Sequence, residues 1–594
     1  MKRFISILLV LVLVFSLTAC GQNTNTGNEK PAGEEPANET PDTETEAGLK
    51  FTPGKYTASA MGMKGDVTVE VEVDETSIKS VKVVDNVDTK GIADAAIEVI
   101  PAKIVEGQTL AVDTVSGATM TSFGILRAAE AALKDAGADV SLLKVKTDKK
   151  ELSQGPAQDY DVVIVGSGAS GLSAAIQLTK DSDLKVLVLE KLAYPGGSSR
   201  VCGGGIWAIG GSVINKNVGV DYTADEYIEF METLGGTTLN RDLMRNIHKV
   251  SAETFDYLVE KGLLVNVTNK SLGHPASNFP VAWSNVNSTV KYNEGYGGKS
   301  IMDFIYELAL ENGAEVRLNS KVTSLVVENG SVKGVNVEGL DSKYTVNAKK
   351  VVLATGGFTR NVEMIKELAP DYASVFAFTG AGSTGDGITM TRDLDTVIVG
   401  EGMMGLTGYN PNYGYYGAEG AIARKGQIYI NKDGKQFGAE KAFYGETLAL
   451  FNNQTDHMAY AICDQNNSDV EGFENGVKAG IVTKADTIEE LATKLDVDKD
   501  AMIQTVKENG LEYGPYYAME VRPLFIGSIP GLKVTENTEV VNSKGEVIPN
   551  LYAVGELTFG NTFNDYYPSS GTGMGTSIYT GAIAARHIVA QLSK

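Results

Sequence analysis

The sequence predicts an α/β protein in which a small α+β domain precedes a larger α/β core. Two patterns predict this organisation. Residues 161–165 form a largely apolar run that leads into a Gly-x-Gly-x-x-Gly turn, which is typical of a buried strand followed by a helix. Upstream, residues 67–73 alternate apolar and polar side chains like a half-buried strand, and residues 125–136 have the apolar spacing of a helix. The larger core is therefore expected to be Rossmann-like.

The composition favours a globular protein of several domains. The chain has 594 residues, of which 43% are hydrophobic and 21% are charged. Its formal net charge of -23 argues against a nucleic-acid partner, because the phosphates would repel such a surface. The cysteines and histidines show no metal-ligand spacing, so no metal site is expected.

The first 48 residues are predicted to export and tether the chain. Lys2 and Arg3 precede an apolar run, residues 4–17, that is too short for an ordinary membrane span. The next residues, Leu-Thr-Ala-Cys, end at Cys20 and resemble a bacterial lipobox. The resemblance implies that residues 1–20 hold a lipoprotein signal peptide, that cleavage precedes Cys20, and that its thiol is lipidated. A plain secretory signal with an incidental cysteine is the alternative.

Residues 21–48 carry almost no large apolar groups and are predicted to be a disordered linker. The folded part would then stand off the membrane that holds the lipid. We therefore expect a protein anchored on the extracellular face of the cell membrane, as in Gram-positive bacteria.

Residues 49–150 are predicted to form the small α+β domain. Between its predicted strands and helix lies the segment Asp113-Thr-Val-Ser-Gly-Ala-Thr119. This segment resembles the Asp-x-x-Ser/Thr-Gly-Ala-Thr/Ser signature of FMN-binding domains in sodium-pumping quinone reductases and bacterial respiratory regulators. The resemblance implies that an exported FMN transferase attaches FMN covalently, through its phosphate, to the hydroxyl of Thr119. A Ser-Gly-Ala turn with a purely structural role is the alternative.

The glycine-rich turn indicates a dinucleotide site. Gly166, Gly168 and Gly171 let the backbone approach a pyrophosphate at a helix N-terminus. Glu190, at the end of the next predicted strand, lies at the right distance for a ribose hydroxyl. NAD is the competing dinucleotide, but later segments favour non-covalently bound FAD. The further candidate contacts in those segments are Gly197, Ser198, Ser199, Asp386 and Glu556.

Over residues 158–594 these segments together resemble the superfamily of FAD-dependent fumarate reductases and 3-ketosteroid dehydrogenases. The resemblance implies an FAD-binding domain built from residues 158–387 and 523–594. It also implies an inserted α+β capping domain, residues 388–522, that closes over the flavin and the substrate.

The candidate active site departs from the fumarate reductase pattern. Soluble fumarate reductases use one arginine to deliver a proton, and a histidine pair and a late arginine to hold carboxylates. Here Tyr444 stands at the first position, Ile526-Gly527-Ser528 at the second, and Tyr566-Tyr567-Pro568 at the third. Burying carboxylates without cationic partners is costly, so the pattern argues against a dicarboxylate substrate.

The replacements resemble the active site of 3-ketosteroid dehydrogenases. Members of that family have a tyrosine at the position of Tyr444 and a Tyr-Pro-x-x-Gly segment that matches Tyr567 to Gly571. The resemblance implies that the Tyr567 O–H and the Gly571 N–H hold an enolate oxygen, while Tyr444 exchanges a proton with carbon. Either Tyr566 or Tyr567 could face the cleft. Alternatively, all of these rings could line the cleft without a catalytic role.

The expected function is an extracellular ene-reductase. The chain shows no second dinucleotide motif for a nicotinamide, so a membrane electron donor would reduce FMN, and FMN would reduce FAD. Hydride transfer from FAD would then reduce the C=C bond of an enone, with Δ4- or Δ1-3-ketosteroids first among the candidates.

Two alternatives stay open. One is a reductase of an unsaturated carboxylate, such as fumarate, urocanate, acrylate or cinnamate, in anaerobic respiration. It would need a cation near the cleft, such as Arg424 or Arg522. The other is a flavin-carrying electron-transfer lipoprotein with no substrate chemistry.

Overall fold

The computed structural model describes most of the chain from residue 49 to residue 593. The described ranges are 49–63, 65–88, 93–115, 118–144, 152–180, 182–207, 223–235, 237–268, 281–284, 297–372, 375–409, 426–439 and 444–593. The predicted signal peptide with Cys20, the predicted linker 21–48 and Arg424 lie outside them. The backbone of Thr119 and Tyr444 is described, but their side chains are not.

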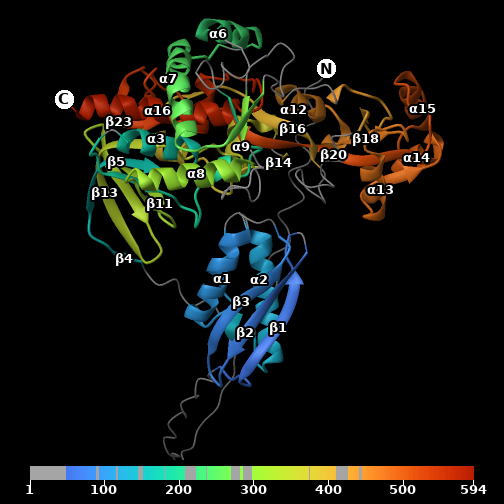
Figure 1. Ribbon diagram of the computed structural model, residues 1–594, viewed down its shortest axis with the longest axis horizontal. Helices are drawn as coiled ribbons and strands as arrows, with labels where there is room; N and C mark the ends of the chain where they lie inside the picture. The colour runs from blue at the N-terminus through green and yellow to red at the C-terminus, as the bar shows by residue number, and fades with distance from the viewer. Residues whose placement is uncertain are drawn as a thin grey trace, which may run out of the picture. The chain divides into compact units, whose positions relative to one another are not determined.

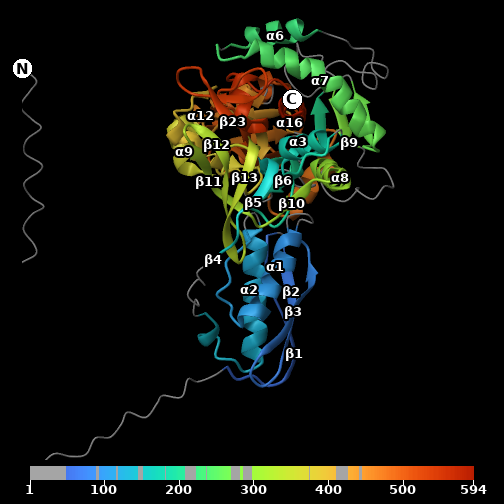
Figure 2. The ribbon, with the colours of Figure 1, turned by 90° about the vertical axis from the view of Figure 1, so that its left-hand side faces the viewer.

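The N-terminal unit, residues 49–144, is a small antiparallel sheet with two helices packed on it (Figures 1 and 2). The strands β1 (Gly54–Met61), β2 (Asp66–Val73) and β3 (Ile78–Asn86) pair in that order. The four valines of β2 alternate with polar residues and are all buried, so one face of the sheet forms the core. Against it lie α1 (Ala93–Gly107) and α2 (Thr119–Asp135).

Helix α2 begins earlier than the apolar spacing predicts. The spacing places a helix over residues 125–136, whereas the helix starts at Thr119. Its first turn carries polar side chains that hydrogen-bond neighbouring parts of the chain. Because these side chains are not apolar, the apolar periodicity does not detect this turn. The predicted FMN acceptor is therefore the first residue of a 17-residue helix.

The C-terminal unit, residues 152–593, is built on a nine-stranded sheet. Its parallel part pairs β10 (Glu315–Arg317), β6 (Val186–Leu189), β5 (Gln158–Val165), β13 (Ser342–Leu353) and β23 (Val547–Ala553). The antiparallel strands β11 (Lys321–Glu328) and β12 (Ser331–Glu338) continue the sheet beyond β13. The short strands β4 (Ser153–Gln154) and β22 (Glu539–Val541) pair with β13 and β23.

Long helices cover this sheet. Helix α3 (Ala169–Thr179) follows β5 and packs against α8 (Gly297–Glu311) and the C-terminal helix α16 (Thr572–Leu592), as Figure 1 shows. Helix α7 (Arg241–Glu260) packs on α16 and on α6 (Ala224–Thr233). The buried apolar strands between these layers give the expected Rossmann-like core.

A second sheet is built mainly, but not entirely, from the predicted capping domain, residues 388–522. Its long strand β20 (Tyr516–Ser528) pairs with β14 (Phe376–Ala377), β16 (Met403–Tyr409), β18 (Ala459–Cys463) and β19 (Thr483–Ala485). Strand β17 (Ile428–Ile430) completes it. Strand β20 runs without interruption across residues 522 and 523, where the sequence places a domain boundary.

The remaining elements are short or surround this second sheet. They are η1 (Leu142–Lys144), α4 (Gly197–Arg200), β7 (Gly205–Trp207), β8 (Val265–Thr268), β9 (Val281–Ser284), α9 (Val362–Leu368), η2 (Pro370–Tyr372), α10 (Asp386–Thr391), η3 (Arg392–Leu394), β15 (Ile398–Val399), α12 (Tyr444–Asn452), η5 (Thr455–His457), α13 (Val470–Lys478), α14 (Ile488–Leu495), α15 (Lys499–Glu508), β21 (Gly531–Leu532) and η6 (Gly555–Asn561).

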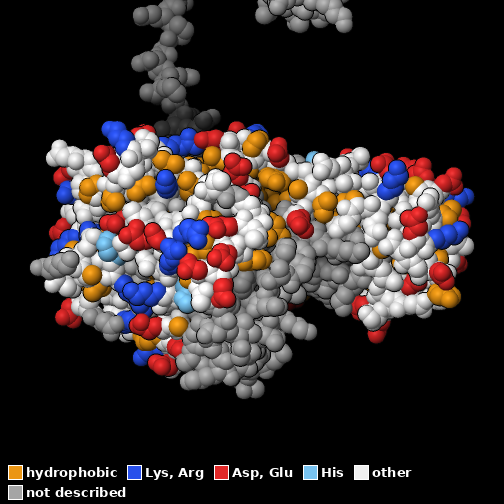
Figure 3. Space-filling view, turned by 90° about the horizontal axis from the view of Figure 1, so that it is seen from above, with side chains coloured by type: hydrophobic (Ala, Val, Ile, Leu, Met, Phe, Trp, Pro, Cys, Tyr) orange, Lys and Arg blue, Asp and Glu red, His pale blue; other side chains and the backbone are white. Residues whose placement is uncertain are grey.

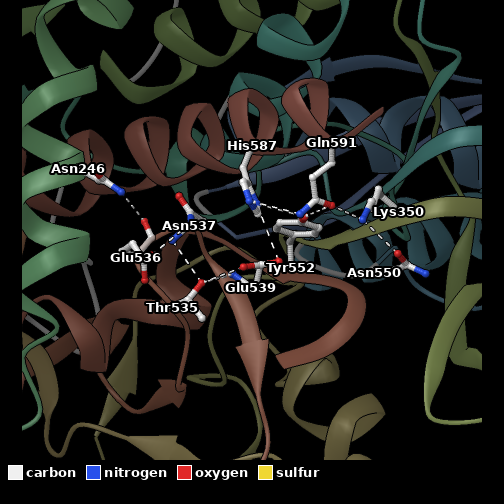
Figure 4. A network of polar contacts seen from close by, with 10 residues as sticks. All are labelled: Asn246, Lys350, Thr535, Glu536, Asn537, Glu539, Asn550, Tyr552, His587 and Gln591. Carbon is white, nitrogen blue, oxygen red and sulfur yellow. Dashed lines mark hydrogen bonds and ion pairs between the residues drawn. The ribbon is translucent and has the colours of Figure 1, made fainter. Parts of the chain in front are cut away.

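A polar network fixes the end of α16 to the sheet (Figure 4). His587 and Gln591 of α16 lie beside Tyr552 of β23, whose hydroxyl is 3.3 Å from His587 Nδ1 and from Gln591 Oε1. Lys350 of β13 donates to Gln591 and to Asn550 Oδ1, and burial lowers its pKa. Three elements that are far apart in the sequence are thereby joined at one edge of the core.

The surface carries mixed charges. On the face in Figure 3, the described acidic and basic side chains are interspersed and form no continuous basic stripe. Within the described ranges, no helix has both the length and the apolar composition that a membrane span requires.

Candidate flavin and substrate sites

Eight of the residues predicted to contact a dinucleotide line one cavity. It encloses about 760 Å³ of empty space, part of it open to solvent. The eight residues are Gly166, Gly168, Glu190, Gly197, Ser198, Ser199, Asp386 and Glu556. They come from the loops that follow β5, β6 and β23 and from the start of α10, so the fold brings distant segments together at the carboxyl ends of parallel strands.

The three glycines of the turn have different physical roles. Gly166 has a φ of +107°, and a Cβ there would lie 2.3 Å from the Ala354 carbonyl oxygen. Gly171 does not line the cavity; a Cβ on it would lie 2.0 Å from the Gly166 carbonyl oxygen, so it lets α3 pack on the turn. A Cβ on Gly168 would meet nothing within 4 Å, which leaves room for a pyrophosphate to approach the backbone.

Glu190 is buried at the end of β6. Its Oε2 accepts hydrogen bonds from the Ser167 backbone N–H at 3.0 Å and from the Ser167 hydroxyl at 2.7 Å, and its Oε1 accepts from the Leu192 N–H at 2.9 Å. A carboxylate has about four acceptor positions, so Glu190 can still accept from a ribose. The sequence motif points to Glu190, whereas the role of Ser167 emerges from the fold.

One residue of the cavity wall calls for a polar ligand such as FAD, and the contacts of Asp386 show how this wall is held. Thr355 lines the wall, and its buried Oγ1 has no hydrogen-bond partner among the described residues, so a polar ligand group would satisfy it. Asp386 accepts from Lys191 Nζ at 2.8 Å and from the Thr384 hydroxyl at 2.7 Å. Sequence reasoning missed Lys191 and Thr384, although Lys191 directly follows Glu190.

Glu556 connects the cavity to the end of β20. Its Oε1 accepts from the Ser528 N–H at 2.8 Å and from the Ser528 hydroxyl at 2.9 Å, and the Gly357 N–H also donates to the carboxylate. Burial raises the pKa of Glu556, and these donors oppose that rise. Because Ser528 ends the long strand of the second sheet, a position predicted to contact FAD is tied directly to that sheet.

Tyr567 and Gly571 are brought together at the start of α16. Tyr567 is buried, and its ring lies edge-on to Phe563 with centroids 5.5 Å apart. Its hydroxyl oxygen accepts from the Gly573 N–H at 3.3 Å, and the Gly571 N–H also donates to it. Burial raises the pKa of Tyr567, and a hydrogen bond with the Thr572 side chain, together with these N–H donors, opposes that rise. Gly571 has a φ of +85° and directly precedes the helix, which turns these N–H groups toward the phenol.

The neighbouring tyrosine lies near another element. Burial, and the charge of Glu446 on α12, raise the pKa of Tyr566 to about 12. Tyr444 is the first residue of α12, two positions before Glu446. The charge of Glu446 therefore reaches Tyr566, which lies near the helix that begins at Tyr444, whereas the Tyr567 hydroxyl accepts a hydrogen bond at the start of α16. Sequence reasoning missed Ser569, whose buried Oγ has no hydrogen-bond partner among the described residues.

Two arginines were named as possible partners of a carboxylate substrate, and the structure describes one of them, Arg522. Arg522 Nε donates to Glu520 at 2.8 Å, and its Nη1 donates to the Asp456 carbonyl oxygen at 2.9 Å, so this guanidinium is already engaged. Arg424 lies outside the described residues. Beside Gly527, the Met404 methyl group fills the space where a Cβ would point, 2.0 Å away, so an apolar group stands at the place of the histidine pair.

Comparison with known families decides the class of the protein. The family model for the FAD binding domain matches residues 161–574. The chain belongs to this family. The model for the FMN-binding domain matches residues 62–134. The protein is thus a flavin-dependent oxidoreductase in which an FMN-binding domain precedes the FAD binding domain, and its cofactors are FAD and FMN.

Two relatives are named for the reduction of unsaturated acids. The chain is 28% identical to the NADH:acrylate oxidoreductase of Vibrio harveyi over 86% of this chain and 59% of that protein, so it spans less than two thirds of that relative. It is also 28% identical to the urocanate reductase of Eggerthella lenta, over 84% of this chain and 87% of that enzyme.

Among solved structures, 3-ketosteroid delta1-dehydrogenase from Sterolibacterium denitrificans shares the fold with a TM-score of 0.63 and 20% identity, over 73% of this chain and 100% of that one. A flavocytochrome c3 fumarate reductase shares it with a TM-score of 0.60 and 24% identity, over 73% and 79%.

Proposed function

We propose that the protein is an ene-reductase that reduces a C=C bond conjugated to a ketone, with a 3-ketosteroid as the preferred class of substrate. One observation carries the proposal: the Tyr567 hydroxyl lies at the N-terminus of α16, beside the capping residue Gly571, and accepts a hydrogen bond from the Gly573 N–H at 3.3 Å. The pairing of Arg522 with Glu520 and with the Asp456 carbonyl oxygen adds support, because a substrate carboxylate would have to compete with these partners for the guanidinium.

The arrangement suits a reaction in which negative charge develops on a ketone oxygen. Bound FAD would supply the hydride, and FMN would supply the electrons. The N–H groups of Gly571 and Gly573 polarise the Tyr567 hydroxyl, and the positive end of the 21-residue helix α16 lies beside it. Each donor aimed at a developing oxyanion stabilises the transition state by about 3–4 kcal/mol in comparable sites.

A proton must also reach the substrate carbon. We assign this step to Tyr444, which begins α12, the helix near which Tyr566 lies. Positioned acids contribute about 10²–10⁴-fold to turnover. In this proposal Tyr444 transfers the proton and Tyr567 holds the oxygen.

The rival substrate class is an unsaturated carboxylate, which the names of the acrylate and urocanate relatives favour. The chemically reduced protein should be mixed anaerobically with progesterone-like enones and, separately, with acrylate, urocanate, cinnamate and fumarate. Flavin reoxidation by the enones and not by the acids supports the proposal. Rapid reoxidation by an acid and by none of the enones would replace it with the rival. Reoxidation by neither class would favour an electron-transfer protein without substrate chemistry.

We further propose that FMN is attached covalently to Thr119 by an exported transferase, and that a membrane donor reduces it. The end of the N-terminal unit at which α2 begins carries exposed apolar side chains that a flavin ring would cover. They are Met61, Met63, Val84, Val87, Met120 and Phe123. Mass spectrometry of the full chain coexpressed with the transferase tests the attachment. An FMN adduct that persists in Thr119→Ala would refute the acceptor assignment.

The same proposal places the protein on the outer face of the cell membrane through a lipid on Cys20. A fragment that starts near residue 155 should then reduce substrate with reduced viologen but not with the membrane donor. Equal activity of the fragment and the full chain with the membrane donor would remove the FMN-binding domain from the electron path.

A further inference from the structure

Two hydroxyl groups that lie outside the Asp-x-x-Ser-Gly-Ala-Thr motif hold the first turn of α2. Thr121 and Ser122 are both buried, and they follow the acceptor position Thr119 by two and three residues. Each hydroxyl bonds a different part of the chain. They therefore fix the helix start from two directions.

The first contact joins three segments of the N-terminal unit. The Thr121 hydroxyl donates to Asp88 Oδ2 at 2.6 Å, and the Met63 N–H donates to Asp88 Oδ1 at 2.9 Å. Asp88 is 8% exposed and lies just beyond β3, while Met63 belongs to the turn between β1 and β2. Backbone also packs closely here: a Cβ on Gly124 of α2 would lie 3.1 Å from Gly62 Cα.

The second contact closes the motif segment onto the helix. The Ser122 hydroxyl donates to the Ala118 carbonyl oxygen at 2.9 Å and accepts from the Val115 N–H at 3.1 Å. The Ala118 N–H in turn donates to the Val115 carbonyl oxygen at 3.0 Å. The residues on both sides of positions 116 and 117 are therefore held to one helical turn.

We propose that Asp88, Thr121 and Ser122 are positioning residues that present the Thr119 hydroxyl for flavin attachment. This inference rests on the proposed acceptor role of Thr119. In the attachment, the Thr119 oxygen forms a bond to the flavin-side phosphate of FAD as donor, and the phosphoanhydride bond breaks. AMP leaves with the electron pair, and the hydroxyl proton passes to the transferase or to water. Such a displacement depends on the orientation of the attacking oxygen, which a fixed helix start provides.

The test uses the full chain, purified transferase and FAD, with the initial rate of adduct formation followed by intact-protein mass spectrometry. Thr121→Val and Ser122→Ala remove one hydroxyl each, and Thr121→Ser restores the donor. Thr109→Val is a matched control, because its hydroxyl likewise donates to one carbonyl, Leu143 at 2.8 Å, and accepts one N–H, that of Ala111 at 3.0 Å.

The control lies away from the acceptor. Lys144, the residue after Leu143, pairs with Glu130, which is eleven residues, or about 16 Å, along α2 from Thr119. Non-covalent FAD in the same chain and the thermal unfolding midpoint report whether each variant is folded.

Thr121→Val and Ser122→Ala should lower the transferase kcat about tenfold or more, with the KM for the acceptor chain within about twofold. Thr121→Ser and Thr109→Val should stay within about twofold of the wild-type rate. Wild-type rates for Thr121→Val, or an equal loss in Thr109→Val, would overturn the inference. If Ser122→Ala unfolds, the pair Thr121→Val and Thr121→Ser decides. An adduct on Thr119→Ala would instead overturn the acceptor assignment itself.

Discussion

A single methyl group at Gly171 should force the helix after the glycine-rich turn away from the turn. The added Cβ would lie 2.0 Å from the Gly166 carbonyl oxygen and 3.1 Å from Ala354 Cβ, whereas unstrained contacts between such atoms are about 3.5 Å. Both obstacles are backbone or a short rigid side chain, so α3 must shift by about 1.5 Å to restore an unstrained contact. Overpacking of this kind costs about 1–3 kcal/mol, and more where backbone cannot give way.

Gly168→Ala serves as the matched control, because it should weaken FAD binding without changing the stability of the protein. Gly168 has a φ of −70°, which alanine tolerates, and a Cβ there would meet nothing within 4 Å. The free energy of unfolding of the FAD-free protein should therefore change by less than about 0.5 kcal/mol. FAD affinity should nevertheless fall roughly tenfold, because the methyl group enters the space through which the pyrophosphate approaches the backbone.

The assay is urea unfolding of the FAD-free variants together with fluorescence titration of FAD. Gly171→Ala should lose stability and FAD binding together, and Gly168→Ala should lose binding alone. The reasoning is refuted if Gly171→Ala unfolds at the wild-type midpoint and binds FAD with an unchanged Kd. Equal destabilisation of the two variants would also contradict it, because the contacts of the two Cβ atoms differ so strongly.

Three further predictions concern chemistry, pH and the anchor. Tyr567→Phe should lower turnover of an enone about 10²–10³-fold, and Tyr444→Phe should lower it about 10²–10⁴-fold, both with little change in KM. Steady-state kinetics with reduced viologen as the electron donor checks both variants. Unchanged turnover would remove the substituted residue from the mechanism. Because burial raises the pKa of Glu556, the folded FAD-free protein holds this proton more tightly than the unfolded chain, so its free energy of unfolding should fall as pH rises above about 4.5. Glu556→Gln should lack this pH dependence, because glutamine does not titrate. If the free energy of unfolding, measured by urea titration, varies with pH in the same way in both proteins, Glu556 is not its source. Cys20→Ser should release the chain from washed membranes or leave it unprocessed, whereas normal processing and retention would count against a lipid anchor.

Much of the flavin site could be predicted from the sequence because it depends on local geometry. The turn at Gly166 and the acid at Glu190 follow directly from strand–turn–helix spacing, Gly197, Ser198 and Ser199 follow from a motif resemblance, and all of these residues line one cavity. The same holds for Tyr567 and Gly571, which are four residues apart and meet at the start of α16. Short spacings survive folding because the local backbone fixes them.

Contacts between distant segments could not be predicted in this way. Ser528 and Glu556 are 28 residues apart, Thr121 and Asp88 are 33 apart, and Lys191 and Asp386 are 195 apart, yet each pair is hydrogen-bonded. A single sequence carries no periodic signal for such pairs. They arise when separate elements pack, so their partners are set by the tertiary structure.

The sequence by itself determined the positions that form the dinucleotide turn, because glycine spacing and apolar periodicity are direct consequences of backbone geometry. Its motifs gave the class of protein and the two flavins through their resemblance to known families. Only the tertiary structure decided that Arg522 is engaged by Glu520 and Asp456, that Tyr566 and Tyr567 lie near different helices, and that a buried aspartate holds the start of the helix that begins at Thr119. The physical reason is that the reach of a side chain, and the groups that satisfy it, depend on which elements fold against it.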